Sequence, residues 1–169
     1  MTAAASTPIA DRGADRAEVL LVCSSGGHLL QLTALHAAWD GFSHVWVTFD
    51  KSDARSLLAG ERVEYAYGPT NRSVWNLVRN LFIAYRLIGR LRPQIILTTG
   101  AGVAVPFAWI GKLRGATVIY VESLTRIESP SLSCRLIRPV AERTYTQWPE
   151  LAPTVAGARH VGNVFGTQP

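Results

Sequence analysis

A polar loop with two adjacent glycines follows the first apolar run of the chain. It comprises Ser24, Ser25, Gly26, Gly27 and His28. Glycine lets backbone N–H groups approach a ligand closely, and the amino end of the helix expected next attracts a phosphate. His28, at the start of that helix, could donate to the phosphate or act as a general base. The alternative is an ordinary strand-to-helix turn in which Ser25 caps the helix and His28 is a satisfied polar residue.

A second loop of the same kind follows a later apolar run. It comprises Thr98, Thr99, Gly100, Ala101 and Gly102. Hydroxyl groups end the run, glycines make a tight turn, and a helix is expected to begin. If both loops lie on one edge of a sheet, they form a cleft lined with backbone donors that a diphosphate could occupy. For Gly102 the alternative is close packing of the helix on the strand.

Glu122 is the third candidate, and it follows the apolar run 118–121. A carboxylate at the carboxyl end of a parallel strand faces the ligand cleft, where it could bind sugar hydroxyls, orient His28 or serve as the general base. The alternative is a helix-capping acid or an ion pair with Arg126. We therefore expect His28 or Glu122 to be the base, and the two glycine loops to hold a diphosphate.

Short β-branched runs alternate with longer helical periods along the chain, which predicts a parallel sheet with helices on both faces. The expected strands are 19–23, 44–49, 63–67, 95–99, 118–121, 143–147 and 159–161. The expected helices are 28–39, 50–58, 73–91, 103–113 and 131–137. Right-handed crossovers make this a Rossmann-like, doubly wound α/β fold, in which ligands lie beyond the carboxyl ends of the strands. We expect a single domain over 18–169 and a disordered tail over 1–17.

The helix expected over 73–91 lies between Glu64 and Glu122, and the residues between these two glutamates include no Asp or Glu. At about 100° per residue, its arginines and Arg72 form one stripe. Most of the remaining circumference is apolar, which is more than an ordinary surface helix needs. Aromatic side chains beside arginines are typical of a helix at a membrane interface, and the alternative is a helix buried between the sheet and a partner subunit. The residues expected to make this contact are Trp75, Arg79, Phe82, Arg86 and Arg90.

Composition narrows the function classes. The two cysteines give no disulfide framework, and no spacing of histidines and cysteines suggests a metal, so we expect neither a metal nor another cofactor on this chain. No run of 18 apolar residues predicts a spanning helix, and residues 1–17 lack the features of a signal peptide. We therefore expect a cytoplasmic protein, peripheral at the cytoplasmic face of a membrane. The net charge of +5 suits an anionic partner, but the chain has no known nucleic-acid recognition motif, so we expect no nucleic acid.

Four motifs, taken in order, resemble one family. They are Ser-Ser-Gly-Gly-His (24–28), Thr-Thr-Gly-Ala-Gly (98–102) with Pro106, Tyr-Val-Glu-Ser (120–123) and Gln-Trp-Pro-Glu-Leu (147–151). Over residues 18–165 the chain resembles the acceptor-binding subunit of a split UDP-N-acetylglucosamine transferase. More distantly, it is similar to the N-terminal half of the MurG-type transferase.

The resemblance implies the N-terminal half of a GT-B glycosyltransferase that is divided between two polypeptides. This half would bind a polyprenyl-diphosphate-linked glycan acceptor and an anionic membrane surface, in oligosaccharide or polysaccharide biosynthesis. A separate donor-binding subunit would hold most of the UDP-sugar site, and the transfer would invert the anomeric carbon. The eukaryotic subunits carry an N-terminal membrane anchor, whereas here we expect recruitment through the arginine-striped helix or through other proteins. The alternative function is a non-catalytic adaptor that recruits a cytosolic transferase to the membrane.

Overall fold

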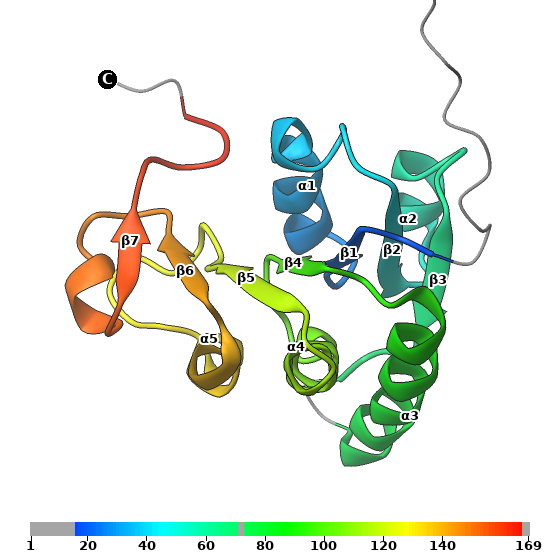
Figure 1. Cartoon of the computed structure of the whole chain (residues 1–169). Helices are drawn as coiled ribbons and strands as arrows, with labels where there is room; N and C mark the ends of the chain where they lie inside the picture. Colours follow the sequence, from blue (N-terminus) through cyan, green and yellow to red (C-terminus); the bar gives the residue numbers. More distant parts are fainter. Residues whose placement is uncertain (1–15, 71–72, 167–169) are drawn as a thin grey trace, which may run out of the picture.

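The structure is a computed structural model, and it describes residues 16–70 and 73–166. Its centre is a sheet of seven strands in the order β3-β2-β1-β4-β5-β6-β7, and every neighbouring pair is parallel (Figure 1). The strands are β1 Val19–Val22, β2 His44–Phe49, β3 Val63–Ala66, β4 Ile95–Thr98, β5 Thr117–Val121, β6 Arg143–Thr146 and β7 Ala158–His160. The helices are α1 Gly27–Ala34, α2 Ser52–Leu57, α3 Val74–Leu91, α4 Ala104–Leu113 and α5 Leu132–Ile137. Short 3-10 turns cover His36–Ala38, Arg138–Val140 and Ala152–Thr154.

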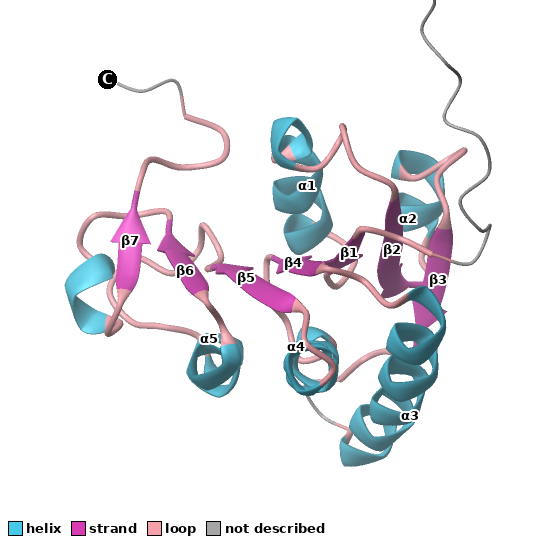
Figure 2. Ribbon diagram, viewed as in Figure 1, coloured by secondary structure: helices cyan, strands magenta, loops and turns pink. Residues whose placement is uncertain are grey.

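Helices cover both faces of the sheet, with α1 and α2 on one face and α3, α4 and α5 on the other (Figure 2). Side chains alternate between the faces along each strand, so each face has its own core. Leu20 and Val22 of β1 share a core with Phe107 of α4. Leu21, between them, shares the other core with Leu29 of α1. The predicted Rossmann-like, doubly wound α/β fold is confirmed.

The order of the strands changes direction at β1. β2 and β3 follow on one side of it, and β4 to β7 extend the sheet on the other side. The last residue of β1, Val22, lies beside Thr98, the last residue of β4. In open α/β sheets, ligands bind outside the carboxyl ends of the strands at such a switch point. The loops after β1 and β4, which contain the two glycine motifs, therefore flank the expected ligand position.

The bounds of the elements lie within two residues of the predicted ones, except at the end of α1. We predicted that this helix continues to Trp39, but it ends at Ala34 and a 3-10 turn follows. The turn places the indole N–H of Trp39 at 3.0 Å from the Leu32 carbonyl and packs its ring edge-to-face against Trp46. Tertiary packing of a buried indole thus ends the helix earlier than its periodicity predicts.

The predicted tail over 1–17 lies outside the described residues, apart from Arg16 and Ala17. Ala17 is buried, and its N–H donates to the carbonyl of Leu91 at 3.3 Å. The end of α3 and the start of β1 are therefore joined at the amino edge of the sheet.

The longest helix, α3, has 18 residues and a length of about 27 Å. Ser73 caps its amino end by accepting from the Asn76 N–H, and Arg92 ends it in a left-handed conformation. Asn80 is buried in its middle and exchanges two hydrogen bonds with the backbone of Tyr67, which holds α3 against the end of β3. Of the helices in the described part of the chain, none is long and apolar enough to cross a membrane.

Candidate functional site

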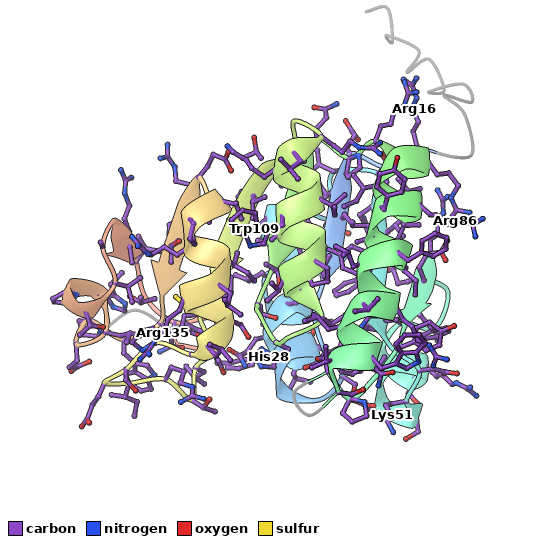
Figure 3. All side chains as sticks on the ribbon, turned by 90° about the horizontal axis from the view of Figure 1, so that it is seen from below. Arg16, His28, Lys51, Arg86, Trp109 and Arg135 are labelled. Carbon is purple, nitrogen blue, oxygen red and sulfur yellow. The ribbon has the colours of Figure 1, made fainter. Side chains whose placement is uncertain are left out.

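The residues predicted to do chemistry come together at the carboxyl edge of the sheet. Arg16, ahead of β1, and Lys51, just after β2, mark its two opposite edges, and His28 lies at the Lys51 edge (Figure 3). Both glycine loops and Glu122 also follow carboxyl ends of strands, which all point the same way. The fold therefore places the three predicted motifs around one switch point.

Two hydrogen bonds tie His28 to the second glycine loop. The imidazole Nδ1 lies 2.7 Å from the carbonyl oxygen of Thr99. In return, the Thr99 hydroxyl donates to the carbonyl of His28 at 2.8 Å. The two residues are 71 positions apart in the sequence, so this pair joins the loops after β1 and β4.

The contact with Thr99 fixes which imidazole nitrogen carries the proton. A carbonyl oxygen only accepts, so Nδ1 must be the donor, and the lone pair of the neutral ring lies on Nε2. Burial lowers the pKa of His28 below its ordinary value of 6.5; the bond to Thr99 and the charge of Glu122 act in the opposite direction but are weaker. The ring is therefore mostly neutral at pH 7, and Nε2 can take up a proton.

Glu122 lies directly after β5, as predicted, but its side chain is completely buried. Its Oε1 accepts from the Tyr120 hydroxyl at 3.0 Å and from the Ser123 N–H at 2.8 Å. Its Oε2 accepts from the N–H of Ser131, the cap residue of α5, at 2.8 Å. The carboxylate thus fastens the loop between β5 and α5, an arrangement close to the helix-capping alternative. Of the two predicted bases, His28 is the one that reaches solvent.

Asp53 belongs to the site although the sequence did not indicate it. Its Oδ2 accepts from the N–H of Gly26 at 2.6 Å, across 27 residues, from the first turn of α2. Gly26 has a φ of 78°, a value that residues with a side chain rarely adopt, so this bend requires glycine. One amide that was expected to meet a phosphate is therefore bound to a carboxylate. A diphosphate must displace Asp53 or use the neighbouring donors.

The rest of the first loop is accessible. Gly26 and Gly27 are exposed, and Ser24 and Ser25 are half-buried. The cap residue of α1 is Gly26, so the alternative in which Ser25 caps the helix is wrong. Among the described residues, a Cβ at Gly27 would have Gln31 Nε2 as its nearest neighbour, at 3.9 Å. The space above Gly27 is therefore open to a ligand.

The second glycine loop is a tight turn at which three segments meet. Gly100 and Ala101 have φ values of 100° and 71°, in the left-handed region. A Cβ on Gly100 would lie 2.9 Å from the Tyr120 hydroxyl, and one on Gly102 would lie 2.8 Å from Thr70 Oγ1. Gly102 thus allows close packing, as its alternative reading proposed, but the neighbour is Thr70 in the segment between β3 and α3. Thr70 is a second neighbour of the site that the sequence did not indicate.

The sequence matches the family model described as "Oligosaccharide biosynthesis protein Alg14 like" over residues 61–164. The chain belongs to this family. Two Alg14 relatives carry the name "UDP-N-acetylglucosamine transferase subunit ALG14". The Mus musculus protein is 24% identical over 86% of this chain and 82% of its own length. The Debaryomyces hansenii protein is 29% identical over 85% of this chain and 75% of its own length.

The Alg14-like fold also matches a solved structure, that of MurG from Acinetobacter baumannii. The TM-score is 0.69 at 16% sequence identity, over 88% of this chain and 46% of the MurG chain. The Alg14-like chain thus spans less than half of the length of MurG. The predicted family, and the predicted likeness of fold to one half of a MurG-type transferase, are confirmed.

The Alg14-like chain exposes a broad apolar surface on its layer of three helices, which lie side by side in Figure 3. Ala84, Leu87 and Leu91 of α3 face the sheet, whereas Trp75 and Phe82 on the opposite side are 64% and 62% exposed. We call this surface the apolar face. Its exposed members are Val74, Trp75, Leu77, Val78, Leu81, Phe82, Tyr85, Trp109, Leu113, Leu132 and Leu136.

The arginines of α3 flank the apolar face on the side of β3. The Arg79 guanidinium lies 5.0 Å from the ring of Tyr67 and 5.3 Å from that of Trp75. Arg86 lies 5.7 Å from the ring of Phe82. Arg90 forms an ion pair with Glu64. The five predicted contact residues therefore form one continuous surface, while Arg72, predicted in the same stripe, lies outside the described residues.

Proposed function

We propose that this chain is the acceptor-binding half of an inverting glycosyltransferase, which a separate donor-binding subunit completes. The enzyme transfers a sugar from a UDP-sugar to a polyprenyl-diphosphate-linked glycan. One fact supports the division: the relatives that the chain matches over most of their length are called transferase subunits. The observation that carries the proposal is His28, held at the switch point by Thr99 with Nε2 available as a base.

The proposed reaction uses His28 as the general base. Nε2 accepts the proton of the acceptor hydroxyl while its oxygen attacks the anomeric carbon of the UDP-sugar. The bond from that carbon to UDP breaks, UDP leaves with the bonding electrons, and attack from the opposite face inverts the configuration. The imidazolium that forms is stabilised by the negative charge of Glu122, which favours the protonated ring. Glu122 thus assists by its charge and by holding the loop after β5, without touching the substrate.

The acceptor diphosphate, in this proposal, lies over the two glycine loops. Glycine at position 27 leaves room for a close approach, whereas Gly100 and Gly102 allow the second loop to pack tightly against Tyr120 and Thr70. The adjoining helix ends favour negative charge. The Asp53 carboxylate opposes a phosphate at this loop, and it must give up the Gly26 N–H or be screened. The proposed contacts are Ser24, Ser25, Gly26, Gly27, Thr99, Gly100, Ala101 and Gly102.

The apolar face is proposed to dock on the cytoplasmic side of an anionic membrane. Exposed Trp75 and Phe82 suit the acyl boundary, and Arg79 and Arg86 beside them suit lipid phosphates. The amino end of α3 lies at the carboxyl edge of the sheet, where Thr70 packs on the second glycine loop. A lipid-linked acceptor could therefore keep its polyprenyl chain in the bilayer while its diphosphate reaches His28.

The test of the divided enzyme is reconstitution. Purified protein should give no product from UDP-N-acetylglucosamine and a polyprenyl-diphosphate-linked sugar, because the donor site lies on another chain. Addition of a donor-binding subunit of the GT-B C-terminal type should produce transfer, followed as radiolabelled lipid-linked product. Rapid turnover by this chain alone would reject the proposal.

Membrane docking predicts a large loss when the arginines of α3 change sign. Each basic residue near an anionic bilayer contributes about 1 kcal/mol. Replacing Arg79, Arg86 and Arg90 by Glu should therefore weaken binding to vesicles that contain phosphatidylglycerol by at least about 100-fold. Sedimentation with vesicles measures this, and circular dichroism checks that the fold is retained.

A matched control for this change is the triple variant with Arg62, Arg143 and Arg159 replaced by Glu. These arginines are also exposed, and the change in net charge is the same, but they lie outside α3. The control should lose much less binding. Equal losses in both triple variants would mean that net charge, and not the apolar face, governs docking.

A further inference from the structure

Two glutamine side chains are buried between His28 and the C-terminal segment, residues 161–166. Gln31 lies on α1 and is 4% exposed, and Gln147 follows β6 and is 2% exposed. Gln147 Nε2 donates to Gln31 Oε1 at 2.6 Å, across 116 residues. Buried amides are costly unless their polar atoms have partners, so the remaining contacts of this pair decide what it does.

Each glutamine also binds two backbone groups. Gln31 Nε2 donates to the Gly27 carbonyl at 2.9 Å, and its Oε1 accepts from the Leu124 N–H at 2.8 Å. Gln147 Nε2 donates to the Glu122 carbonyl at 2.8 Å, and its Oε1 accepts from the Val164 N–H at 3.1 Å. Because carbonyls only accept and amide N–H groups only donate, these partners fix the orientation of both amides.

The result is a continuous path of hydrogen bonds from the C-terminal segment to the first turn of α1. The path runs from Val164 through Gln147 and Gln31 to Gly27, the residue before His28. In Figure 1 the C-terminal segment rises from β7, and the hydrogen bonds of the glutamine pair connect this segment with α1. The same pair holds the backbone of Glu122 and Leu124 after β5.

We infer that Gln31 and Gln147 are positioning residues that set the first turn of α1, and that the C-terminal segment is part of this framework through the Val164 N–H. The inference rests on the proposed role of His28 as the base. Nε2 is useful only if the imidazole is held against Thr99, and the ring's place depends on the backbone at Gly27. A looser pair should lower the rate of the chemical step without changing the binding of the UDP-sugar, whose site is proposed to lie on the other subunit.

A substitution at Val164 can remove the backbone N–H that donates to Gln147. Val164 is the second residue of a turn over 163–166, in which the Gly166 N–H donates to the Asn163 carbonyl. Proline is favoured at this position of common turns, and it has no N–H. Val164→Pro therefore removes the donor to Gln147 while keeping the turn. Val164→Ala is the matched control, because it removes most of the side chain and keeps the N–H.

The expected result has two parts. In the isolated chain, Val164→Pro should shift the ring signals of His28 in the NMR spectrum, and Val164→Ala should leave them unchanged. In the transferase reconstituted at saturating donor subunit, Val164→Pro should lower kcat about three- to tenfold, the effect of about one hydrogen bond, with the KM of the UDP-sugar kept.

The outcomes separate this inference from the proposed function. Unchanged His28 signals in Val164→Pro, or equal shifts in both variants, would overturn the coupling whether or not the chain is a transferase. If the reconstituted wild-type protein made no product, the proposed function would fail while the NMR comparison still decided the coupling. A rise in KM at constant kcat would also contradict positioning of the base.

Discussion

Replacement of His28 by Asn should lower kcat of the reconstituted transferase by about 10² to 10⁴, the usual contribution of a general base. An asparagine amide can still donate to the Thr99 carbonyl, so the link between the two glycine loops is retained while the proton acceptor at Nε2 is lost. The KM values for both substrates should change little. Initial rates over a range of both substrates measure the effect.

The pH dependence of the same enzyme provides a second check on His28. A base must be unprotonated to act, so kcat/KM should rise with pH and level off above the pKa of the imidazole. Because burial lowers this pKa, the inflection should lie below 6.5. It should be absent in His28→Asn. His36→Asn, at an exposed histidine outside the site, is the control and should keep both the rate and the inflection. Full activity in His28→Asn would show that the base lies elsewhere or that the chain is an adaptor.

Replacement of Gly27 by Val should prevent use of the acceptor. A valine side chain would occupy the space above the first loop where the diphosphate is proposed to lie. Each lost hydrogen bond to a charged phosphate costs about 1.5–3 kcal/mol, so the acceptor KM should rise about 10- to 100-fold or more. The KM for the UDP-sugar should be unchanged, because the donor site is on the other subunit. Steady-state kinetics with each substrate varied in turn separates the two constants.

Gly27 suits this test because the fold tolerates a side chain there. Among the described residues, the nearest atom to an added Cβ is 3.9 Å away, whereas at Gly100 and Gly102 it is under 3.0 Å. A higher acceptor KM at unchanged kcat in Gly27→Val therefore reports on the ligand, whereas a fall in kcat would indicate that the added side chain disturbs Gln31 and the position of His28. Gly41→Val is the control, since Gly41 is exposed, has no described neighbour within 4 Å of the added Cβ and precedes β2 at the opposite edge. An unchanged acceptor KM in Gly27→Val would remove the first loop from the diphosphate site.

The sequence predicted the fold, and it predicted that the candidate residues meet at one edge of the sheet, because both depend on local patterns. Alternating strands and helices imply a parallel sheet, and a parallel sheet brings every strand-end loop to one edge. That is why the glycine loops and His28 could be assigned to one cleft before any contact was known. The apolar side of α3 was likewise visible from its periodicity, and the structure confirms that Trp75 and Phe82 face outward.

What the sequence could not predict are contacts between residues far apart in the chain. Asp53, which stands in no motif, reaches Gly26 across 27 residues. Gln147 opens the fourth family motif, but the motif does not indicate that it reaches Gln31 across 116 residues. The burial of Glu122 depends on a loop that folds back to bring the Ser131 N–H onto its carboxylate. Position at a strand end predicts that a side chain is near the cleft, but only tertiary packing decides whether it is open to the substrate.

Equilibrium binding to the isolated chain tests directly whether it is the acceptor-binding half of the transferase. A short-chain polyprenyl-diphosphate-linked sugar in detergent and UDP-N-acetylglucosamine are titrated separately into the wild-type protein and Gly27→Val. We expect saturable binding of the lipid-linked diphosphate, at least about tenfold weaker in Gly27→Val, and no measurable binding of UDP-N-acetylglucosamine to either protein. Tight binding of the UDP-sugar together with no binding of the lipid-linked diphosphate would contradict this expectation, since this chain would then be the donor-binding half.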